Sequence, residues 1–265
     1  MVKIADDIEG EILFEDLEYS PYGDVSKPIA AISKVGKVVN FKVLSYTTED
    51  GVMKAKLSRK ASMQEAFENF VDKLEPGEIV DAKITHIEKY GAFCDIACGL
   101  TYLLPIENFC VTRIDNAQDV LKGVNTIKAV VYGKNKAGKI VLTHKELLGT
   151  WDEEAAKFEA GNVVIGTVRS VETYGVFIEL TPNLSGLAEA TDKVKVGDKV
   201  NILIKSIIPE KMKIKLNILD LDNGEFENDP RIKFKYTQAT GKIDRWKYSS
   251  DKADKLIETD FTKQA

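Results

Sequence analysis

An internal duplication constrains the fold of this chain more than any other feature. Tyr90-Gly91-Ala92-Phe93 recurs 84 residues later as Tyr174-Gly175-Val176-Phe177, and residues 77–84 match the second copy at the same offset. Further along, residues 139–142 have their match at an offset of 74. Two offsets that each hold over several residues indicate a duplicated module with one insertion. We place the ten extra residues of the first copy between Pro105 and Ala117.

Each copy is predicted to form five short strands. In the second copy the expected strands are rich in Val and Ile, and Gly, Pro, Asn and Asp separate them. About sixty residues in five strands, without a helical period, are typical of a small closed barrel of the oligonucleotide-binding (OB) type. The expected strands of the second copy are 163–171, 176–180, 184–190, 199–208 and 213–219.

The repeated motif predicts a surface for stacking flat ligands. Residues three apart on a regular strand point to opposite faces, and a bulge or a bend between them, which glycine permits, would return both aromatic rings to one face. Exposed aromatic rings on a barrel stack the bases of single-stranded nucleic acid. We therefore expect Tyr90, Phe93, Tyr174 and Phe177 to project outward. The alternative is that one ring of each pair fills the barrel core.

Short helices are expected ahead of each copy, over residues 61–74 and 146–160. Ser62 with Glu65 would form a capping box for the first helix, and Thr150 with Glu153 would form one for the second. The apolar residues of both helices recur at helical spacing, which predicts that they pack against a barrel. They are Met63, Ala66, Phe67, Phe70, Val71 and Leu74, then Trp151, Ala155 and Phe158.

Both ends of the chain differ from the two copies. Residues 1–60 resemble the later strands of the module, since 57–60 match 142–145, and they predict a partial barrel whose first strands are missing. Such a sheet exposes an edge, which we expect to be covered or oligomerised. Residues 221–265 form a tail in which 231–236 and 242–248 are predicted to pair as a hairpin. The hairpin either adds RNA contacts or packs on the last barrel.

A family resemblance covers both copies. Gly161, Val168 and Val171, followed by the aromatic motif, then Gly197-Asp198-Lys199-Val200 and Lys213-Ile214-Lys215-Leu216, resemble the RNA-binding domain named after ribosomal protein S1. The resemblance implies an all-β chain of tandem five-stranded OB-fold barrels joined by short helices, with a partial barrel ahead of them and a β-hairpin tail behind. The complete barrels would be 75–145 and 161–220, with the helical spacers between modules.

The resemblance also implies which residues meet RNA. The two rings of each motif would stack on bases, and basic residues near strand five would neutralise phosphates. Pro105 and Glu189 stand where the family often has histidine. We therefore expect a depleted basic side, with Glu189 repelling phosphate in the second barrel. The candidates are Tyr90, Phe93, Tyr174 and Phe177 for stacking, Lys139, Lys145 and Lys213 for phosphate, and Lys83, Lys89 and Arg169 as weaker ones.

Charge narrows the class of partner. The net charge is −5, and the acidic excess falls mostly outside the two copies. Affinity would then come from stacking and a local basic face, so single-stranded RNA is expected and duplex DNA is not. The chain has no apolar run long enough to span a membrane and no signal core at its start. We expect a cytoplasmic protein without a membrane partner.

The residues give no support for catalysis, a metal or a cofactor. Cys94, Cys98 and Cys110 are too few for a disulfide framework, and we expect small buried side chains. His86 and His144 have no partner spacing that indicates a nucleophile with its base, so we expect them to be incidental. No phosphate-cradling loop or carboxylate cluster occurs. The chain is therefore predicted not to be an enzyme.

Three functions remain open at this point. The leading hypothesis is a single-stranded RNA-binding protein that acts in translation, binding mRNA at the small ribosomal subunit. The first alternative is a scaffold that docks on the ribosome or on another protein and has weak RNA affinity. The second is an accessory RNA-binding segment of a ribonuclease or a phosphorolytic nuclease.

Overall fold

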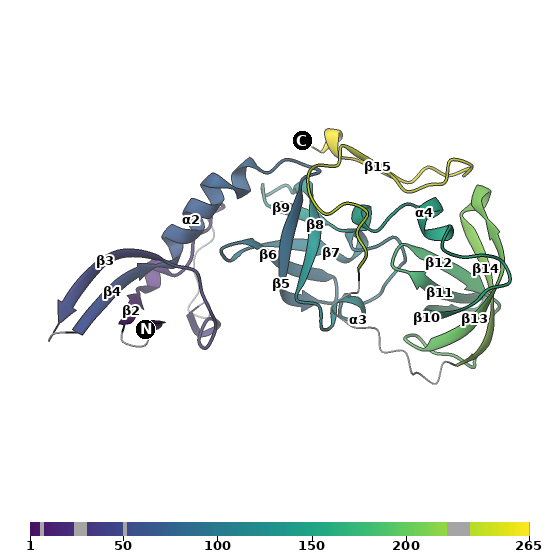
Figure 1. Ribbon diagram of the computed structural model, residues 1–265, viewed down its shortest axis with the longest axis horizontal. Coiled ribbons are helices and arrows are strands. Elements are labelled where there is room, and N and C mark those ends of the chain that lie inside the picture. The colour runs from purple at the N-terminus through teal and green to yellow at the C-terminus, as the bar shows by residue number, and fades with distance from the viewer. Residues whose placement is uncertain (6–7, 24–30, 50–51, 222–233, 265) are drawn as a thin grey trace. The chain divides into compact units, whose positions relative to one another are not determined.

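The computed structural model describes residues 1–5, 8–23, 31–49, 52–221 and 234–264 (Figure 1). They fall into two compact units. Unit 1 comprises Met1–Leu74 with two short segments, Asp95–Tyr102 and Asn135–Lys139, and unit 2 comprises the rest of the chain. The predicted all-β class is confirmed, because two closed five-stranded barrels follow one another along the chain.

The two barrels have the same strand order. In each, the third and fifth strands pair in parallel, and the fifth pairs antiparallel with the fourth. The first barrel has the order β5-β6-β7-β9-β8, and the second has β10-β11-β12-β14-β13 (Figure 1). The strands are β5 (Ile79–Glu88), β6 (Gly91–Ala97), β7 (Leu100–Pro105), β8 (Thr126–Lys134), β9 (Ile140–Thr143), β10 (Val163–Glu172), β11 (Gly175–Thr181), β12 (Leu184–Ala188), β13 (Lys199–Ile208) and β14 (Lys213–Leu221).

Alternation along the strands builds each barrel core. On β13, Val200, Ile202 and Ile204 are fully buried while their neighbours are partly or fully exposed. A period of two is what a strand with one buried face requires. Burying one such side chain stabilises the fold by about 1.5–3 kcal/mol. Ile178 on β11 and Cys94, its counterpart on β6, are likewise fully buried, as expected for small apolar residues.

The predicted insertion lies between the third and fourth strands of the first barrel. Residues 106–125 separate β7 from β8, whereas only residues 189–198 separate β12 from β13. The insertion contains the 3-10 helix η3 (Ile106–Asn108) and the helix α3 (Gln118–Leu121). It also contacts the second barrel, because the Val111 N–H donates to Asn183 Oδ1 (3.0 Å).

Asn183 lies at the junction between the two barrels and forms hydrogen bonds with several segments there. The sequence predicts only a turn at this residue, yet its side chain is buried. Its Nδ2 donates to the carbonyl oxygens of Lys145 (2.8 Å) and Gly149 (2.9 Å), and the Tyr248 hydroxyl donates to its backbone oxygen. A buried amide is stable only when its donors and acceptors are satisfied. Asn183 therefore ties the second barrel to the insertion, the linker and the tail.

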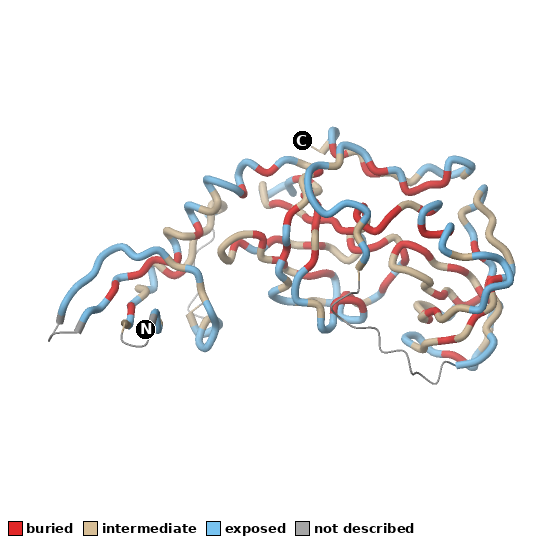
Figure 2. Tube along the Cα trace, viewed as in Figure 1, coloured by how far each residue is buried: buried red, intermediate tan, exposed pale blue. Residues whose placement is uncertain are grey.

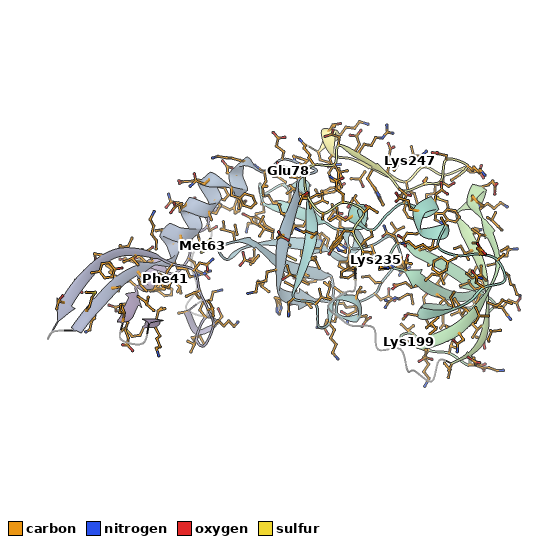
Figure 3. The ribbon with its side chains drawn as sticks, viewed as in Figure 1. Phe41, Met63, Glu78, Lys199, Lys235 and Lys247 are labelled. Atoms are coloured by element: carbon orange, nitrogen blue, oxygen red, sulfur yellow. The ribbon has the colours of Figure 1, made fainter. Side chains whose placement is uncertain are left out.

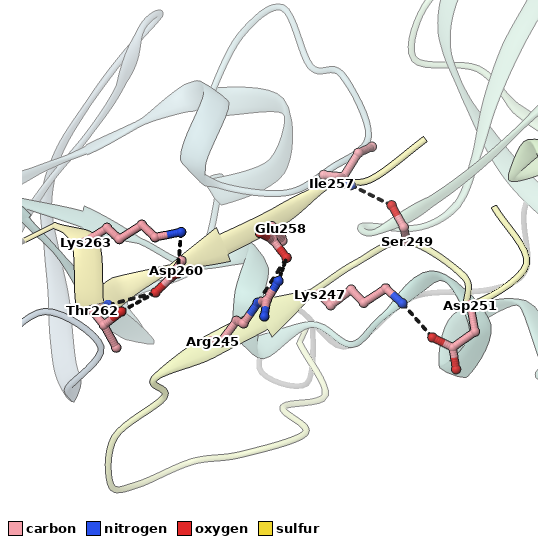
Figure 4. Close-up of polar contacts among 9 residues, drawn as sticks. All are labelled: Arg245, Lys247, Ser249, Asp251, Ile257, Glu258, Asp260, Thr262 and Lys263. Carbon is pink, nitrogen blue, oxygen red and sulfur yellow. Dashed lines mark hydrogen bonds and ion pairs between the residues drawn. The ribbon is translucent and has the colours of Figure 1, made fainter. Parts of the chain in front are cut away.

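The tail contains a strand pair, but its partners differ from the prediction. β15 (Arg245–Lys247) pairs antiparallel with β16 (Glu258–Asp260), and the 3-10 helix η7 (Phe261–Lys263) follows. Residues 234–236 form no strand, and residues 231–233 lie outside the described ranges. Arg245 forms an ion pair with Glu258 across the two strands (Figure 4), which favours the observed register.

Aromatic side chains fix the tail to both barrels. Trp246 and Tyr248 belong to the core cluster of the second barrel. Phe261 packs with Val130 and Leu147 of the first barrel. Glu78, just ahead of β5 (Figure 3), forms a β-bridge with the tail at Lys242. The tail therefore packs on both barrels of unit 2.

The linker helix before the second barrel is confirmed with its cap. The helix α4 (Trp151–Ala155) is shorter than predicted and begins after the capping box of Thr150 and Glu153. Trp151 and Ala155 join the core of the second barrel, and Phe158 packs partly against it. The predicted packing of this apolar stripe on a barrel is therefore confirmed.

The cap predicted for the first helix is wrong. The helix α2 (Arg59–Asn69) begins four residues earlier than Ser62 would place it, and its N-cap is Ser58, whose Oγ accepts from the Ala61 N–H (2.9 Å). Ser58 is the last residue of the strand β4 (Val52–Ser58), and its Oγ also donates to Asp16 Oδ1 (2.8 Å), which fixes it for capping. The helix buries Met63 (Figure 3), whereas Phe70 is 42% exposed.

Unit 1 contains an open four-stranded sheet. Its strands are β1 (Val2–Ala5), β2 (Ile8–Ile12), β3 (Lys42–Glu49) and β4 (Val52–Ser58), in the order β1-β2-β4-β3. β2 and β4 are parallel, so the order matches strands two, three, five and four of the closed barrels. The sequence suggested that the second strand would also be missing, but β1 occupies its place. Much of this sheet is exposed, as Figure 2 shows.

His144 is buried where the first barrel meets the tail. Its Nδ1 lies 2.9 Å from the Phe109 carbonyl oxygen, and its Nε2 lies 3.3 Å from the Tyr236 hydroxyl. The Phe109 ring stacks on it at 4.7 Å between centroids. Desolvation by burial lowers the pKa of His144 to about 4. Glu146 is also buried, accepts from the hydroxyl groups of Thr143 and Thr259, and has a raised pKa because of burial.

Within the described residues, no helix combines the length and the apolar character needed to cross a membrane.

The first prediction concerns the cap of α2. Ser58→Ala removes the acceptor for the Ala61 N–H and the hydrogen bond to Asp16, so the free energy of unfolding of unit 1 should fall by about 0.5–2 kcal/mol. Urea unfolding, monitored by amide exchange in α2, measures this loss of stability. Ser62→Ala is the matched control and should change stability by less than about 0.5 kcal/mol. Equal losses in both variants would contradict the assignment of Ser58 as the cap.

The second prediction concerns pH. A histidine whose pKa is depressed by folding contributes fully above about pH 6.5, and its contribution is lost as the pH falls towards 4. The free energy of unfolding of unit 2 should therefore fall by up to about 3 kcal/mol over this window, and the urea midpoint should fall with it. Trp151 and Trp246 report the transition by fluorescence, since both lie in its core.

Glu146 has the opposite effect on stability. Because its pKa is raised in the folded protein, its contribution to the free energy of unfolding increases as the pH falls. The difference between the wild type and His144→Gln isolates the histidine. The variant should lose the fall in stability between pH 6.5 and 4. His86→Gln is the matched control, since the His86 side chain is exposed. An unchanged pH profile in His144→Gln would show that burial of His144 does not cause the slope.

Candidate nucleic-acid interface

The repeated aromatic motif lies at the start of the second strand in each barrel. Tyr90 and Tyr174 occupy the turn before that strand, and the motif glycine opens it. An added Cβ would lie 2.4 Å from the Leu104 oxygen at Gly91, and 2.6 Å from the Ala188 oxygen at Gly175. The glycine is thus needed because the third strand comes close, and its positive φ (+154° at Gly91 and +157° at Gly175) fits the expected bend between the two rings. In the second barrel a bulge lies on β10, opposite the motif.

The rings of the motif lie at the surface of their barrels. Tyr90 is 55% exposed and Tyr174 is 67% exposed, while Phe93 and Phe177 are half-buried. The rings of Tyr174 and Phe177 meet edge to face, with 6.1 Å between centroids. The residues that fill the cores are the neighbours of the phenylalanines on the same strands, namely Ala92, Cys94, Val176 and Ile178.

A groove on the second barrel brings these rings together with lysines. It has a volume of about 770 Å³ and is lined from β11, β12, β13 and β14. The predicted Lys213 lines it, but Lys205 and Lys215 also do and were missed. A sequence signal for Lys215 existed, because Lys213 and Lys215 alternate with the buried Ile214 and Leu216 and must share one face. The groove therefore combines a stacking surface with three cationic side chains.

Glu189 also lines this groove, but a lysine partly neutralises it. Lys205 Nζ lies 3.0 Å from Glu189 Oε1, and both side chains are largely exposed. The expected depletion of the basic side does not describe the groove, since three lysines face one carboxylate there. The sequence missed this pair because its two members come from separate strands.

The first barrel offers a different set of groups. The His86 ring stacks at 6.5 Å from Phe93, and its Nε2 lies 2.7 Å from Glu88 Oε1. His86 was expected to be incidental, yet it extends the aromatic surface. Its neighbours Lys83 and Lys89 are both exposed.

The two strand-five lysines of the first barrel already have neighbours. Lys145 is half-buried and its Nζ donates to the Glu107 carbonyl oxygen (3.3 Å) in the insertion. Lys139 belongs to unit 1, where its Nζ lies 5.5 Å from the ring centroid of Tyr22, a cation–π contact. Val141 stands where the second barrel has Lys215. Fewer lysines are therefore available in the first barrel than around the groove of the second.

Arg169 is engaged inside its own barrel. Its Nε lies 2.7 Å from Glu179 Oε2, and each side chain is only 13% exposed. It occupies the extra position of the bulge between Val168 and Ser170. Breaking an ion pair this buried would leave an uncompensated charge, so the guanidinium is held against Glu179. The role predicted for Arg169 stays a prediction.

Two of the three cysteines lie in surroundings that suppress reactivity. Cys94 and Cys110 are buried, and desolvation raises the pKa of each thiol to about 12. A thiol with so high a pKa is a poor nucleophile and a poor metal ligand. Within the ranges given above, no group of three or more His, Cys, Asp or Glu side chains is placed to hold a metal ion.

Comparisons of sequence show which known proteins this chain resembles. Residues 73–145 match the family model described as S1 RNA binding domain. Small ribosomal subunit protein bS1 of Leuconostoc lactis is 31% identical over 192 residues, which cover 66% of this chain and 44% of that protein. The protein of the same name from Chlamydia muridarum (strain MoPn / Nigg) is 28% identical over 231 residues, covering 82% of this chain and 40% of the relative.

A relative with another name matches a similar stretch. The 4-hydroxy-3-methylbut-2-enyl diphosphate reductase of Clostridium acetobutylicum is 28% identical over 205 residues, which cover 71% of this chain and 32% of that protein. The chain thus spans less than half the length of each of these relatives. The resemblance inferred from the repeated motif is confirmed by the family match and by the ribosomal relatives.

The third prediction tests the motif glycine. Gly175→Ala places a Cβ against the Ala188 carbonyl at a backbone φ of +157°, so the second barrel should lose more than about 2 kcal/mol of stability. Urea unfolding followed by tryptophan fluorescence measures it. Gly197→Ala is the matched control, because Gly197 also has a positive φ (+94°) but has no atom within 4 Å of the added Cβ. It should lose only about 1–2 kcal/mol, the cost of a left-handed conformation for a residue with a Cβ, and equal losses would show that the close contact with β12 is unimportant.

Proposed function

We propose that this chain, which carries an S1-type domain over residues 73–145 and resembles ribosomal S1 proteins, binds single-stranded RNA. The groove of the second barrel carries the proposal, because it sets Tyr174 and Phe177 beside Lys205, Lys213 and Lys215. Stacking on aromatic rings together with a cationic groove is the general mode of binding to unpaired strands. We also propose the finer role, binding of mRNA at the small ribosomal subunit, and the match to relatives named small ribosomal subunit protein bS1 supports its ribosomal part.

The groove selects unpaired strands over duplexes. A base can stack on Tyr174 or Phe177 only when its face is free, and in a duplex both faces are covered by neighbouring bases. Each stacked base contributes about 1–3 kcal/mol. Nothing in the aromatic surface distinguishes one base from another, so we expect weak sequence preference from the rings themselves.

The first barrel adds a second platform of Tyr90, Phe93 and His86. Its lysines are fewer, so it should bind more weakly by itself. Both platforms belong to unit 2, and the junction at Asn183 joins their barrels. An RNA that reaches both would gain affinity from the effective concentration of the second platform.

We infer that the chain acts by binding and not by catalysis. The polar groups that line the groove are three lysines, one paired carboxylate and the hydroxyl groups of Ser185 and Tyr174, a set suited to holding a polyanion. The reductase relative does not change this, since the chain matches only a third of that protein.

The fourth prediction is an RNA titration. A labelled 12-nucleotide single-stranded RNA should bind the full chain with an affinity that falls as salt rises, measured by fluorescence anisotropy. The Tyr174→Ala/Phe177→Ala variant should raise Kd by about 5- to 150-fold for each base stack lost. Lys213→Ala/Lys215→Ala should lower the slope of log K against log salt by about 1.4. Tyr90→Ala/Phe93→Ala should have the smaller effect.

Lys195→Ala is the matched control for charge, because Lys195 is exposed on the same barrel and does not line the groove. Duplex DNA should not compete at equal nucleotide concentration. No salt-sensitive RNA binding, together with capture of the chain on small ribosomal subunits, would favour the docking scaffold instead. Shortening of the RNA that depends on phosphate or on a metal would favour a nuclease segment.

A further inference from the structure

The open sheet of unit 1 can be aligned residue by residue with the two closed barrels. In all three, the fourth strand pairs with the fifth, and a bulge interrupts the pairing at one shared place; the second barrel has a further shift between Asn201 and Ile202. The residue just before that bulge, and its partner on the fifth strand, define the same register each time. These pairs are Val43 with Leu57, Val131 with Leu142, and Ile204 with Leu216.

In the closed barrels this residue receives the start of strand one. The Ile204 N–H donates to the Asn162 oxygen (3.0 Å), and the Ile204 oxygen accepts from the Gly161 N–H (2.8 Å). The Val131 N–H and oxygen make the same two bonds, with the Glu78 oxygen (2.9 Å) and the Gly77 N–H (2.8 Å). The shared register indicates that the backbone N–H and oxygen of Val43 point to the corresponding open edge of β3.

The glycine in this contact has a fixed conformation. Gly77 has φ +91° and Gly161 has φ +93°, in the left-handed region that glycine adopts at little cost. The first strand then runs for ten residues in each barrel, with alternating burial over part of its length. Strand one is therefore recognised by a glycine, one further residue and an alternating apolar run.

Unit 1 presents the acceptor without the strand. Among its described residues, β3 and β1 are the two edges of the sheet, at the places that flank strand one in the barrels. Val43 is 36% exposed, whereas Val131 and Ile204 are 0–1% exposed. Tyr46 on the same strand is 61% exposed. A long edge strand without proline is a template for another strand, and here its surface includes apolar groups that a barrel would cover.

We propose that the sheet of unit 1 binds an extended segment as a fifth strand, between β3 and β1, and so closes into a barrel. The segment opens on glycine, which adopts a left-handed conformation and donates its N–H to the Val43 oxygen. The following residue accepts from the Val43 N–H, and a strand of about ten residues, with apolar side chains at alternate positions over part of its length, then pairs with β3 and β1. This is strand addition, in which main-chain hydrogen bonds give affinity and alternate side chains give selectivity.

The test uses the full chain and an N-acetylated synthetic peptide with the sequence of residues 161–172, so that the glycine has an amide N–H to donate. Amide exchange should show that Val43 exchanges rapidly in the free chain. Saturating peptide should slow it at least about tenfold, together with amides of β1, while the amides of Val131 and Ile204 stay unchanged. A second N-acetylated peptide with sarcosine in place of the glycine carries a methyl group where the first donates an N–H to Val43, and should bind at least about fivefold more weakly. A scrambled peptide of the same composition should give no protection.

Three results would overturn the proposal. The first is an amide of Val43 that is as protected in the free chain as that of Ile204, since the edge would then already be paired. The second is equal protection by the scrambled peptide. The third is protection that rises with the concentration of the chain alone, which would assign the edge to a second copy. RNA binding by the groove of the second barrel is independent of all three.

Discussion

Closure of the barrel by strand one is the constraint on which the rest of the structure depends. Two backbone hydrogen bonds join the entrance of that strand to the residue before the bulge of the fourth strand, at Val131 and at Ile204. Without them a five-stranded sheet has two exposed edges and an uncovered core. The open sheet of unit 1 shows the consequence, because Val43 at the same register is 36% exposed.

Closure also positions the candidate interface. The turn that leads from strand one into strand two carries the tyrosine of the motif, and strand two carries the phenylalanine. The glycine between them lets strand two approach the carbonyl of strand three, at Leu104 or Ala188. In the second barrel, strands three, four and five then add Glu189, Lys205 and Lys213 around the rings. The groove is thus a product of strand order and not of any one segment.

The sequence predicted what depends on local patterns. The duplicated motif, the alternating strands and the capping box of Thr150 with Glu153 are signals between near neighbours, and they gave the barrels, the insertion and α4. The cap of α2 was assigned wrongly because two serines stand four residues apart, and the contact with Asp16 that favours Ser58 comes from a distant part of the chain.

Contacts between distant segments carried no such signal. The pairing of β15 with β16 depends on Trp246 packing into the second barrel and on the ion pair of Arg245 with Glu258. The alternating pattern of residues 231–236 therefore predicted the wrong pairing partner for β15. The pairing of Lys205 with Glu189, and of Arg169 with Glu179, likewise joins strands that only the folded barrel brings together. Considering each charged residue separately therefore underestimated the number of lysines around the groove of the second barrel.

The two barrels have diverged in what their surfaces do, and the insertion explains part of the difference. In the first barrel the segment after strand three is longer. Its Val111 N–H donates to the Asn183 side chain, and its Glu107 carbonyl oxygen accepts from Lys145. A lysine near strand five thereby becomes part of the packing. The second barrel has the short connection, and its lysines remain around the groove. The same module can therefore serve mainly to build the junction in one copy and to present a cationic aromatic groove in the other.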